Sequence, residues 1–138
     1  MANTSLESIA QKMRKLDIAA LTTMTDSGEL ATRPMSNNGD VEYDGNSYYF
    51  TFEQSRTVSD IGRNPRVSLA FEGKDGLYVS VAGTAELIRD KAQFEEHWVP
   101  DLDKWFDQGA DTPGLVLLKV KAGRIKLWQG EDSEEWKA

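Results

Sequence analysis

Apolar positions near the start of the chain recur with the period of an α-helix. Four of them share one helical face: Leu6, Ile9, Met13 and Leu16. This spacing predicts a helix over residues 4–16. Thr4 and Glu7 have the spacing of a capping box, in which two side chains satisfy backbone N–H groups of the first turn. We therefore expect the chain to open with one amphipathic helix.

The rest of the chain is dominated by short apolar or β-branched segments separated by turn residues. These segments predict strands over residues 18–25, 29–36, 47–52, 66–72, 77–88, 115–121 and 124–129. Turns at residues 26–28 and 75–76 link neighbouring segments as hairpins. Gly83, inside the fifth segment, marks a bulge or a sharp bend, which a barrel needs in order to close. Six or seven such strands favour a mainly β fold, a small antiparallel barrel, over a doubly wound parallel sheet.

Helical segments interrupt these strands. The pattern predicts a short helix over residues 55–61 and a helical stretch over residues 90–104 that is interrupted or ended near Pro100. A loop over residues 107–114 follows. The acidic run at residues 131–135 lacks the geometry of a metal site, so we expect a solvated terminus there.

Residues 115–118 have the sequence Leu-Val-Leu-Leu and are apolar at every position. A strand that is apolar on both faces is expected to be buried on both. In a small domain the simplest cover for the second face is another subunit. The segment therefore predicts a homodimer.

Composition narrows the classes of function. With 138 residues, we expect a single domain over residues 1–138, large enough for one hydrophobic core. No apolar run is long enough to span a membrane, and the first residues lack the basic and apolar regions of a signal peptide. The formal net charge of −7 argues against general nucleic-acid binding, which needs a basic face. We therefore expect a cytoplasmic protein with no nucleic-acid or membrane partner.

The chain is poor in reactive side chains. It contains no cysteine, which excludes disulfides, thiolate metal sites and a cysteine nucleophile. His97 is the only histidine, so a histidine-based triad and a multi-histidine metal site are excluded as well. We expect this histidine on a helix surface and predict no metal site.

A candidate anion site lies where the predicted strand at residues 47–52 leads into the helix at residues 55–61. Ser55, Arg56 and Thr57 stand at the start of that helix. Backbone N–H groups at a helix N-terminus are unpaired, hydroxyl groups donate hydrogen bonds, and an arginine adds a fork of donors. Such an arrangement suits a phosphate. Ser55 also has a simpler interpretation as a helix N-cap, which stabilises a helix by about 1 kcal/mol.

Several motifs resemble those of a known family in their order and spacing. They are Ala-Thr-Arg-Pro-Met-Ser at 31–36, the block at 49–71, Tyr-Val-Ser-Val-Ala-Gly-Thr-Ala at 78–85, Trp-Val-Pro at 98–100, Trp-Phe-Asp-Gln-Gly at 105–109 and Ile-Lys-Leu-Trp-Gln-Gly at 125–130. Together they resemble the pyridoxamine 5′-phosphate oxidase-like split barrels, in particular their general stress protein 26 group, which binds FMN. The resemblance implies a split-barrel homodimer with two FMN sites at the subunit interface.

The chemistry of FMN and the resemblance together select candidate cofactor-binding residues. The phosphate suits the Ser55-Arg56-Thr57 segment. The hydrogen-bonding edge of the ring suits two stretches of strand backbone, namely Pro34, Met35 and Ser36 with Phe50, Thr51 and Phe52. Pro34 has no N–H, so only its carbonyl can serve. Arg33 offers a second positive charge, for either the phosphate or the ring. By resemblance, Trp128 reaches the site from the partner subunit, and Tyr78 occupies a polar family position.

Two departures from the family pattern affect this interpretation. Thr57 stands where the family usually has a lysine, so the phosphate loses one cation, which Arg56 is able to replace. The acidic residues 131–135 stand where the oxidases carry an Arg-Leu-His-Asp-Arg type of segment that holds substrate and FMN. Because acidic residues repel a phosphorylated vitamer, we do not expect pyridoxamine phosphate oxidase activity.

No set of residues indicates a catalytic acid, base or nucleophile, which fits a protein whose cofactor carries the chemistry. Two classes of function stay open. One is an FMN-dependent oxidoreductase with a small-molecule electron donor or acceptor; the other is a non-enzymatic FMN carrier or stress sensor. A third class, a split barrel that uses a deazaflavin or no cofactor, ranks below these two. The sequence also leaves open whether Trp105 covers the flavin or anchors the core or the dimer interface.

Overall fold

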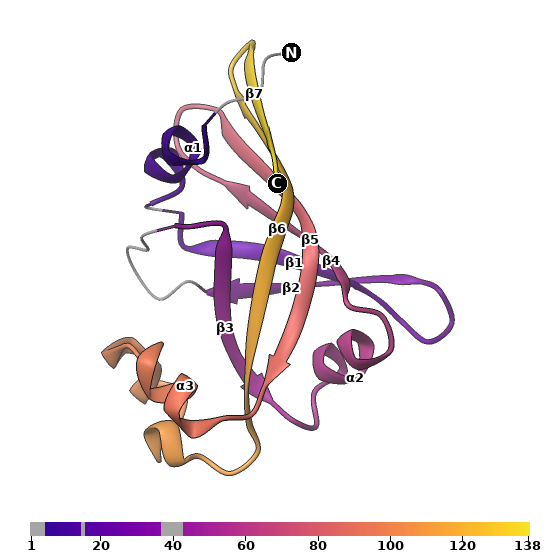
Figure 1. The fold of residues 1–138 in the computed structure, drawn as a ribbon, viewed down its shortest axis with the longest axis vertical. Helices are drawn as coiled ribbons and strands as arrows, with labels where there is room; N and C mark the ends of the chain where they lie inside the picture. Colours follow the sequence, from indigo (N-terminus) through magenta and orange to yellow (C-terminus); the bar gives the residue numbers. More distant parts are fainter. Residues whose placement is uncertain (1–4, 15, 37–42) are drawn as a thin grey trace.

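The computed structural model describes residues 5–14, 16–36 and 43–138 and shows one seven-stranded sheet with short helices around it (Figure 1). The helices are α1 (Leu6–Met13), α2 (Arg56–Arg63) and α3 (Lys91–Glu96), and two 3-10 helices follow, η1 (Pro100–Lys104) and η2 (Gly109–Asp111). The strands are β1 (Ile18–Met24), β2 (Leu30–Ser36), β3 (Asn46–Phe52), β4 (Arg66–Glu72), β5 (Leu77–Ile88), β6 (Leu115–Gln129) and β7 (Asp132–Lys137).

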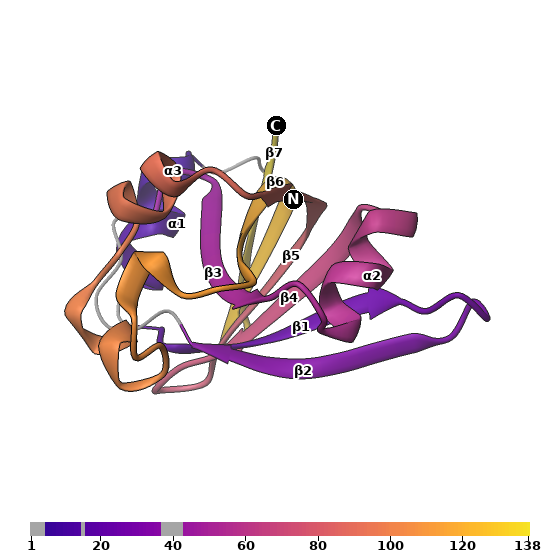
Figure 2. The ribbon, with the colours of Figure 1, turned by 90° about the horizontal axis from the view of Figure 1, so that it is seen from below.

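All strand pairs are antiparallel, and the strands follow the order β2-β1-β4-β5-β6-β3 across the sheet, with β7 also paired to β6. The first part of β6 pairs with β3 and its last part pairs with β7, so β6 contributes to both ends of the molecule. Figure 2 shows β3 standing across from the β1–β2 hairpin, with α2 and α3 on opposite sides of it. The predicted mainly β, antiparallel fold is confirmed.

A bulge lets β6 run on through a bend. The register between β5 and β6 shifts between Ala82 and Gly83, which pair with Arg124 and Ala122, so Gly123 is the extra residue. A Cβ atom at Gly83 would lie 2.1 Å from the carbonyl oxygen of Lys121, so no larger residue fits there. The bulge predicted at this glycine is confirmed. The prediction of two separate strands, 115–121 and 124–129, was wrong because the bulge bends one continuous strand without ending it.

Two groups of apolar side chains fill the structure. The barrel core is aliphatic for the most part and is formed by inward-facing residues of α1 and the strands, among them Leu21, Leu69, Val81, Leu118 and Ile125. The second group, which we call the aromatic cluster, comprises the buried residues Phe94, Leu102, Phe106, Leu115 and Leu117, with Phe50 and Trp98 packed against them.

The aromatic cluster explains the doubly apolar segment at residues 115–118. Val116 and Leu118 point into the barrel core, whereas Leu115 and Leu117 point into the aromatic cluster. All four are at most 5% exposed, so burial on both faces is found within one chain. The inference that a partner subunit covers the second face was wrong, because α3, η1 and their neighbours already cover it.

Both predicted helices outside residues 55–61 are shorter than expected. The first helix begins after Ser5, whose Oγ accepts a hydrogen bond from the N–H of Ser8 at 3.3 Å, and it spans only Leu6–Met13. The capping box assigned to Thr4 lies outside the described residues. The helical stretch predicted over residues 90–104 ends at Glu96, and η1 begins at Pro100, where a proline fits the first helical position.

Two expectations about polar segments were also wrong. The acidic run at residues 131–135 is not a loose terminus: all of it except Glu131 belongs to β7, where Glu134 pairs with Lys12 of α1 at 2.5 Å and Trp136 packs against the barrel core. His97 does not lie on an open helix surface. It is partly buried at the end of α3, and its ring stacks on Tyr48 with 3.7 Å between the ring centroids.

Among the described residues, no helix has the length and apolar character required to cross a membrane.

Candidate functional site

A pocket of about 430 Å³ opens where the sheet fails to close on itself. The strand order begins with β2 and ends with β3, and neither has a further strand on its outer edge in the described part of the chain. The pocket lies between these two edges. Its lining includes the predicted residues Pro34, Met35 and Ser36 of β2 and Phe50, Thr51 and Phe52 of β3. The structure therefore brings two segments distant in sequence together at one seam.

The local sequence explains why β2 can serve as an edge. Pro34 cannot donate a backbone hydrogen bond, and proline is tolerated in a sheet mainly on edge strands. No residue of β2 is fully buried, so this strand is attached through β1 more than through core packing. Met35 is partly buried and packs on the barrel core while it also lines the pocket. The seam thus has a backbone edge facing a mostly apolar cavity.

An aromatic wall closes one side of the pocket. Phe106 is buried and lies 5.2 Å from Phe52 and 6.4 Å from Phe50, measured between ring centroids. The indole of Trp98 packs on Phe50 and donates a hydrogen bond to Asp103 at 3.0 Å, which ties the residues before η1 to its last turn. Trp105 also lines the pocket but is 65% exposed. The aromatic cluster therefore supports the pocket directly, and Trp105 stands at its solvent side.

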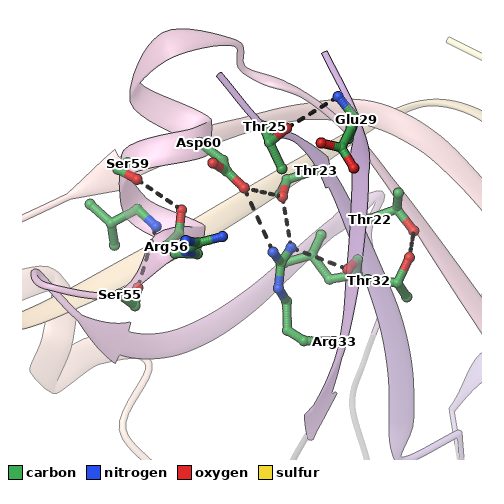
Figure 3. Close-up of polar contacts among 12 residues, drawn as sticks. Thr22, Thr23, Thr25, Glu29, Thr32, Arg33, Ser55, Arg56, Ser59 and Asp60 are labelled. Carbon is green, nitrogen blue, oxygen red and sulfur yellow. Dashed lines mark hydrogen bonds and ion pairs between the residues drawn. The ribbon is translucent and has the colours of Figure 1, made fainter. Parts of the chain in front are cut away.

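The start of α2 adjoins the same pocket. Ser55 is the N-cap: its Oγ accepts a hydrogen bond from the N–H of Val58 at 3.3 Å, so the simple capping role is confirmed (Figure 3). Thr51, which lines the pocket, donates a hydrogen bond to the same oxygen at 3.4 Å. This contact connects the apolar cavity to the helix N-terminus.

The other two residues of the predicted anion site point in different directions. Arg56 is exposed and forms no ion pair with any residue that the structure describes. Thr57 is 7% exposed and faces the protein interior. A cation thus stands free at the first turn of α2, next to backbone N–H groups that have no intrahelical partner.

Arg33 does not project freely into solvent. Its Nη1 donates hydrogen bonds to Thr23 Oγ1 at 2.8 Å and to the carbonyl of Leu21 at 3.3 Å, and its Nη2 lies 3.7 Å from Asp60 Oδ2. Figure 3 shows the guanidinium directed at Thr23 and Asp60. Burial lowers the pKa of Arg33, and the nearby carboxylate of Asp60 acts in the opposite direction. The charge of this arginine is therefore largely compensated inside the protein.

Tyr78 and Trp128 do not line this pocket. They face each other across β5 and β6 on the outer side of the sheet, where they are 50% and 38% exposed. The ammonium of Lys126 lies 5.2 Å from the centre of the Trp128 ring. Two large aromatic side chains are thus available to a second molecule and not to the site of their own chain.

The family model of the pyridoxamine 5′-phosphate oxidase-like proteins matches residues 4–137. The chain belongs to this family.

Particular relatives place it near the general stress proteins. It is 32% identical over 109 residues to General stress protein 26 of Bacillus subtilis, a match that covers 72% of this chain and 77% of that protein. The structure of General Stress Protein 26 from Bacillus anthracis superposes with a TM-score of 0.79 at 22% identity, covering 98% of this chain and all of the other. The general stress FMN/FAD binding protein from Xanthomonas citri gives a TM-score of 0.76 at 24% identity, covering 91% and 89%. The expected membership is confirmed, and the fold is the split barrel of these proteins.

Two groups of site residues escaped prediction from the sequence of this pyridoxamine 5′-phosphate oxidase-like protein. Leu102 and Phe106 line the pocket from η1 and the residues after it. The sequence signal for them was their spacing of four residues, next to Trp105, which the sequence had already suggested as a cover for the flavin. Thr23 and Asp60 hold Arg33 from β1 and α2, and no local pattern marks them. No cluster of three or more histidine, cysteine, aspartate or glutamate side chains that could hold a metal ion occurs among the described residues.

Proposed function

We propose that this protein binds FMN at the seam, with the flavin ring in the pocket and the phosphate at the N-terminus of α2. The observation that carries the proposal is the contact between Thr51 and Ser55, which joins the pocket to the helix start. A ligand that is flat and mostly apolar at one end and anionic at the other matches this arrangement. The name of the Xanthomonas citri relative adds independent support for a flavin.

The residues present fit the two ends of such a cofactor. Phe50, Phe52 and Phe106 form apolar walls for the ring, and the strand edges on either side supply backbone donors and acceptors for its polar rim. At the other end, the first-turn N–H groups of α2 attract an anion, and Arg56 adds an uncompensated charge. Because Arg33 is already paired with Asp60, Arg56 is the principal cation for the phosphate in this proposal.

A second copy of the chain completes the proposed site. On the outer face of the sheet, Ala20 pairs with Ala70 and Ala70 with Ser80, so a row of small side chains crosses this face. Tyr78 and Trp128 stand on the same side and are exposed. We expect two such faces to pack together, which brings the partner's Trp128 to the flavin. Sedimentation should show a species of twice the 15.4 kDa of one chain, and Ala70→Arg should dissociate it.

FMN, when bound, supplies reversible transfer of a hydride or of single electrons. The pocket lining contains no carboxylate, imidazole or amine from the described residues. Its one ionisable group, the phenol of Tyr49, is buried, and burial raises its pKa so that it stays neutral. The side chains around the pocket therefore bind, orient and exclude water but offer no acid or base. We propose a stress-related, FMN-dependent oxidoreductase of small molecules.

The same lack of acid–base groups favours a second candidate, a non-enzymatic FMN carrier or sensor. Pyridoxamine phosphate oxidase activity is not part of either proposal, because the acidic strand β7 stands where the oxidases carry a basic segment that holds substrate. Anaerobic mixing of FMN-loaded protein with a reduced nicotinamide separates the two candidates. Rapid bleaching of the flavin band supports the oxidoreductase, and an unchanged band supports the carrier.

Titration with FMN and riboflavin tests the cofactor itself. FMN should bind saturably with quenched fluorescence, and riboflavin, which lacks the phosphate, should bind more weakly. Equal affinities would show that the N-terminus of α2 does not bind the phosphate. Absence of binding for both would overturn the proposed function.

A further inference from the structure

Asp60 is a buried carboxylate that no part of the proposed flavin chemistry uses. It is 2% exposed and lies on the inner side of α2. Its Oδ2 accepts a hydrogen bond from the hydroxyl of Thr23 at 2.8 Å and lies 3.7 Å from Nη2 of Arg33, while its Oδ1 accepts one from Arg63 at 3.0 Å. One carboxylate thus joins three elements, β1, β2 and α2 (Figure 3).

A buried charge is costly, and a pair of apolar residues often stabilises a protein as well or better. What this arrangement provides is a fixed position for the side chain of Arg33. The guanidinium of Arg33 is fixed from three directions, by the Leu21 carbonyl, the Thr23 hydroxyl and the Asp60 carboxylate. A side chain fixed in this way also restrains the backbone that carries it.

The restrained backbone is the part of β2 that lines the pocket. Residues 34–36 follow Arg33 directly, and β2 is hydrogen-bonded to a strand on one side only and has no fully buried residue. Core packing therefore fixes this strand weakly. The contact from Arg33 to Asp60 ties it to α2, the element whose N-terminus forms the other end of the proposed site.

We propose that Asp60 is a positioning residue of the flavin site, which acts through Arg33 to hold the pocket edge of β2 in register with α2. This inference rests on the proposed function and deepens it. It also gives Arg33 a role: its side chain connects the two halves of the site, and Arg56 is the residue that binds the phosphate.

Replacement of Asp60 by Asn separates positioning from charge. If Asp60 positions β2, Asp60→Asn should weaken FMN and riboflavin by the same factor, roughly 5- to 50-fold, the range typical of coupled residues in one hydrogen-bond network. If Asp60 instead acts only as a nearby negative charge, its removal should tighten FMN binding and leave riboflavin unchanged. The two accounts thus predict opposite signs for FMN.

Arg63 offers a matched control, because it pairs with the same carboxylate but lies 47% exposed on α2 and does not reach β2. Arg63→Gln should leave both flavin affinities within about twofold of the wild type, as is usual for a surface ion pair. A loss equal to that of Asp60→Asn would show a general effect on α2 and would overturn the role assigned to Arg33.

A double-variant comparison covers the case in which Asp60→Asn fails to fold. Arg33→Gln leaves Asp60 paired with Arg63, and the double variant Arg33→Gln/Asp60→Asn contains no unpaired buried carboxylate. If Asp60 acts through Arg33, these two variants should bind flavins equally. A further loss in the double variant overturns the proposal.

Titration of the full-length wild type against both ligands comes first and distinguishes the two levels of failure. A wild type that binds neither flavin overturns the proposed function and this inference with it. If the wild type binds FMN, and Asp60→Asn binds FMN and riboflavin each as tightly as the wild type does, this inference alone is overturned.

Discussion

The barrel core and the aromatic cluster are both well buried, yet they do different work. The barrel core is enclosed by β1, β4, β5 and β6 and touches the pocket at few points, chiefly through Tyr49 and Met35. The aromatic cluster lies between β3, β6 and η1, and two of its buried members, Leu102 and Phe106, are pocket walls. Burial in the barrel core serves mainly stability, whereas burial in the aromatic cluster also shapes the site.

The largest effect should come from the barrel core. Leu69 is fully buried, so Leu69→Ala removes apolar contacts and leaves a cavity, which should lower the free energy of unfolding by about 2–5 kcal/mol. Urea unfolding measures the change. Because Leu69 does not line the pocket, FMN affinity of the folded variant should stay at the wild-type value. A large loss of affinity in a folded variant would contradict the separation of the two regions.

Phe106 should show both effects at once. Phe106→Ala removes a buried ring that packs on Phe50, Phe52 and Trp98, and it should lower the free energy of unfolding by about 2–4 kcal/mol. The same change opens the pocket wall, so FMN and riboflavin should both bind less tightly. Phe106→Leu, which keeps an apolar side chain, is the control and should recover much of the stability. Unchanged flavin binding in a folded Phe106→Ala protein would show that the aromatic cluster does not shape the flavin site.

Arg56 lies outside both regions and should affect the ligand without affecting the fold. Hydrogen bonds to charged groups contribute about 1.5–3 kcal/mol, so Arg56→Ala should weaken FMN roughly 10- to 150-fold. Riboflavin affinity should change far less, since it has no phosphate. Calorimetric titration measures both, with thermal unfolding as the control. An unchanged FMN affinity would place the phosphate elsewhere.

Trp105 should give the smallest effect. The ring is 65% exposed, so Trp105→Ala should change the free energy of unfolding by less than about 0.5 kcal/mol. If the ring covers the flavin, both flavins should lose about 2- to 10-fold in affinity, the value of one aromatic contact. Trp105→Phe should retain most of the affinity. Full affinity in Trp105→Ala would leave the ring as a surface residue beside the pocket.

The same two regions show how far sequence reasoning reached. The strands of the barrel core were predicted with nearly correct limits, because alternation and turn residues are local signals. The segment at residues 115–118 was correctly predicted to be buried on both faces, but its cover was assigned to a partner subunit. The actual cover comes from α3 and η1 of the same chain, and nothing local in residues 115–118 specifies which surface meets them.

The candidate site divides in a similar way. The motif around Arg33 and the strand at Phe50 were found because they stand in a recognisable order along the chain. That Arg33 turns toward Asp60, and that Thr57 is buried while Arg56 is exposed, depends on how α2 lies against β1 and β2. These contacts join residues far apart in sequence, so no local pattern predicts them.

The sequence by itself determined the strands other than β7 and the continuity of β6, the bulge at Gly83, the family and the two segments that line the pocket. These features depend on periodicity, on backbone conformation and on motifs, all of which are local properties of the chain. Only the tertiary structure decided that β2 and β3 are the two edges of one sheet, that the aromatic cluster covers β6, and that a buried Asp60 compensates Arg33. The physical reason is that edges, covers and charge partners are defined by which surfaces meet, and that is settled only when the whole chain folds.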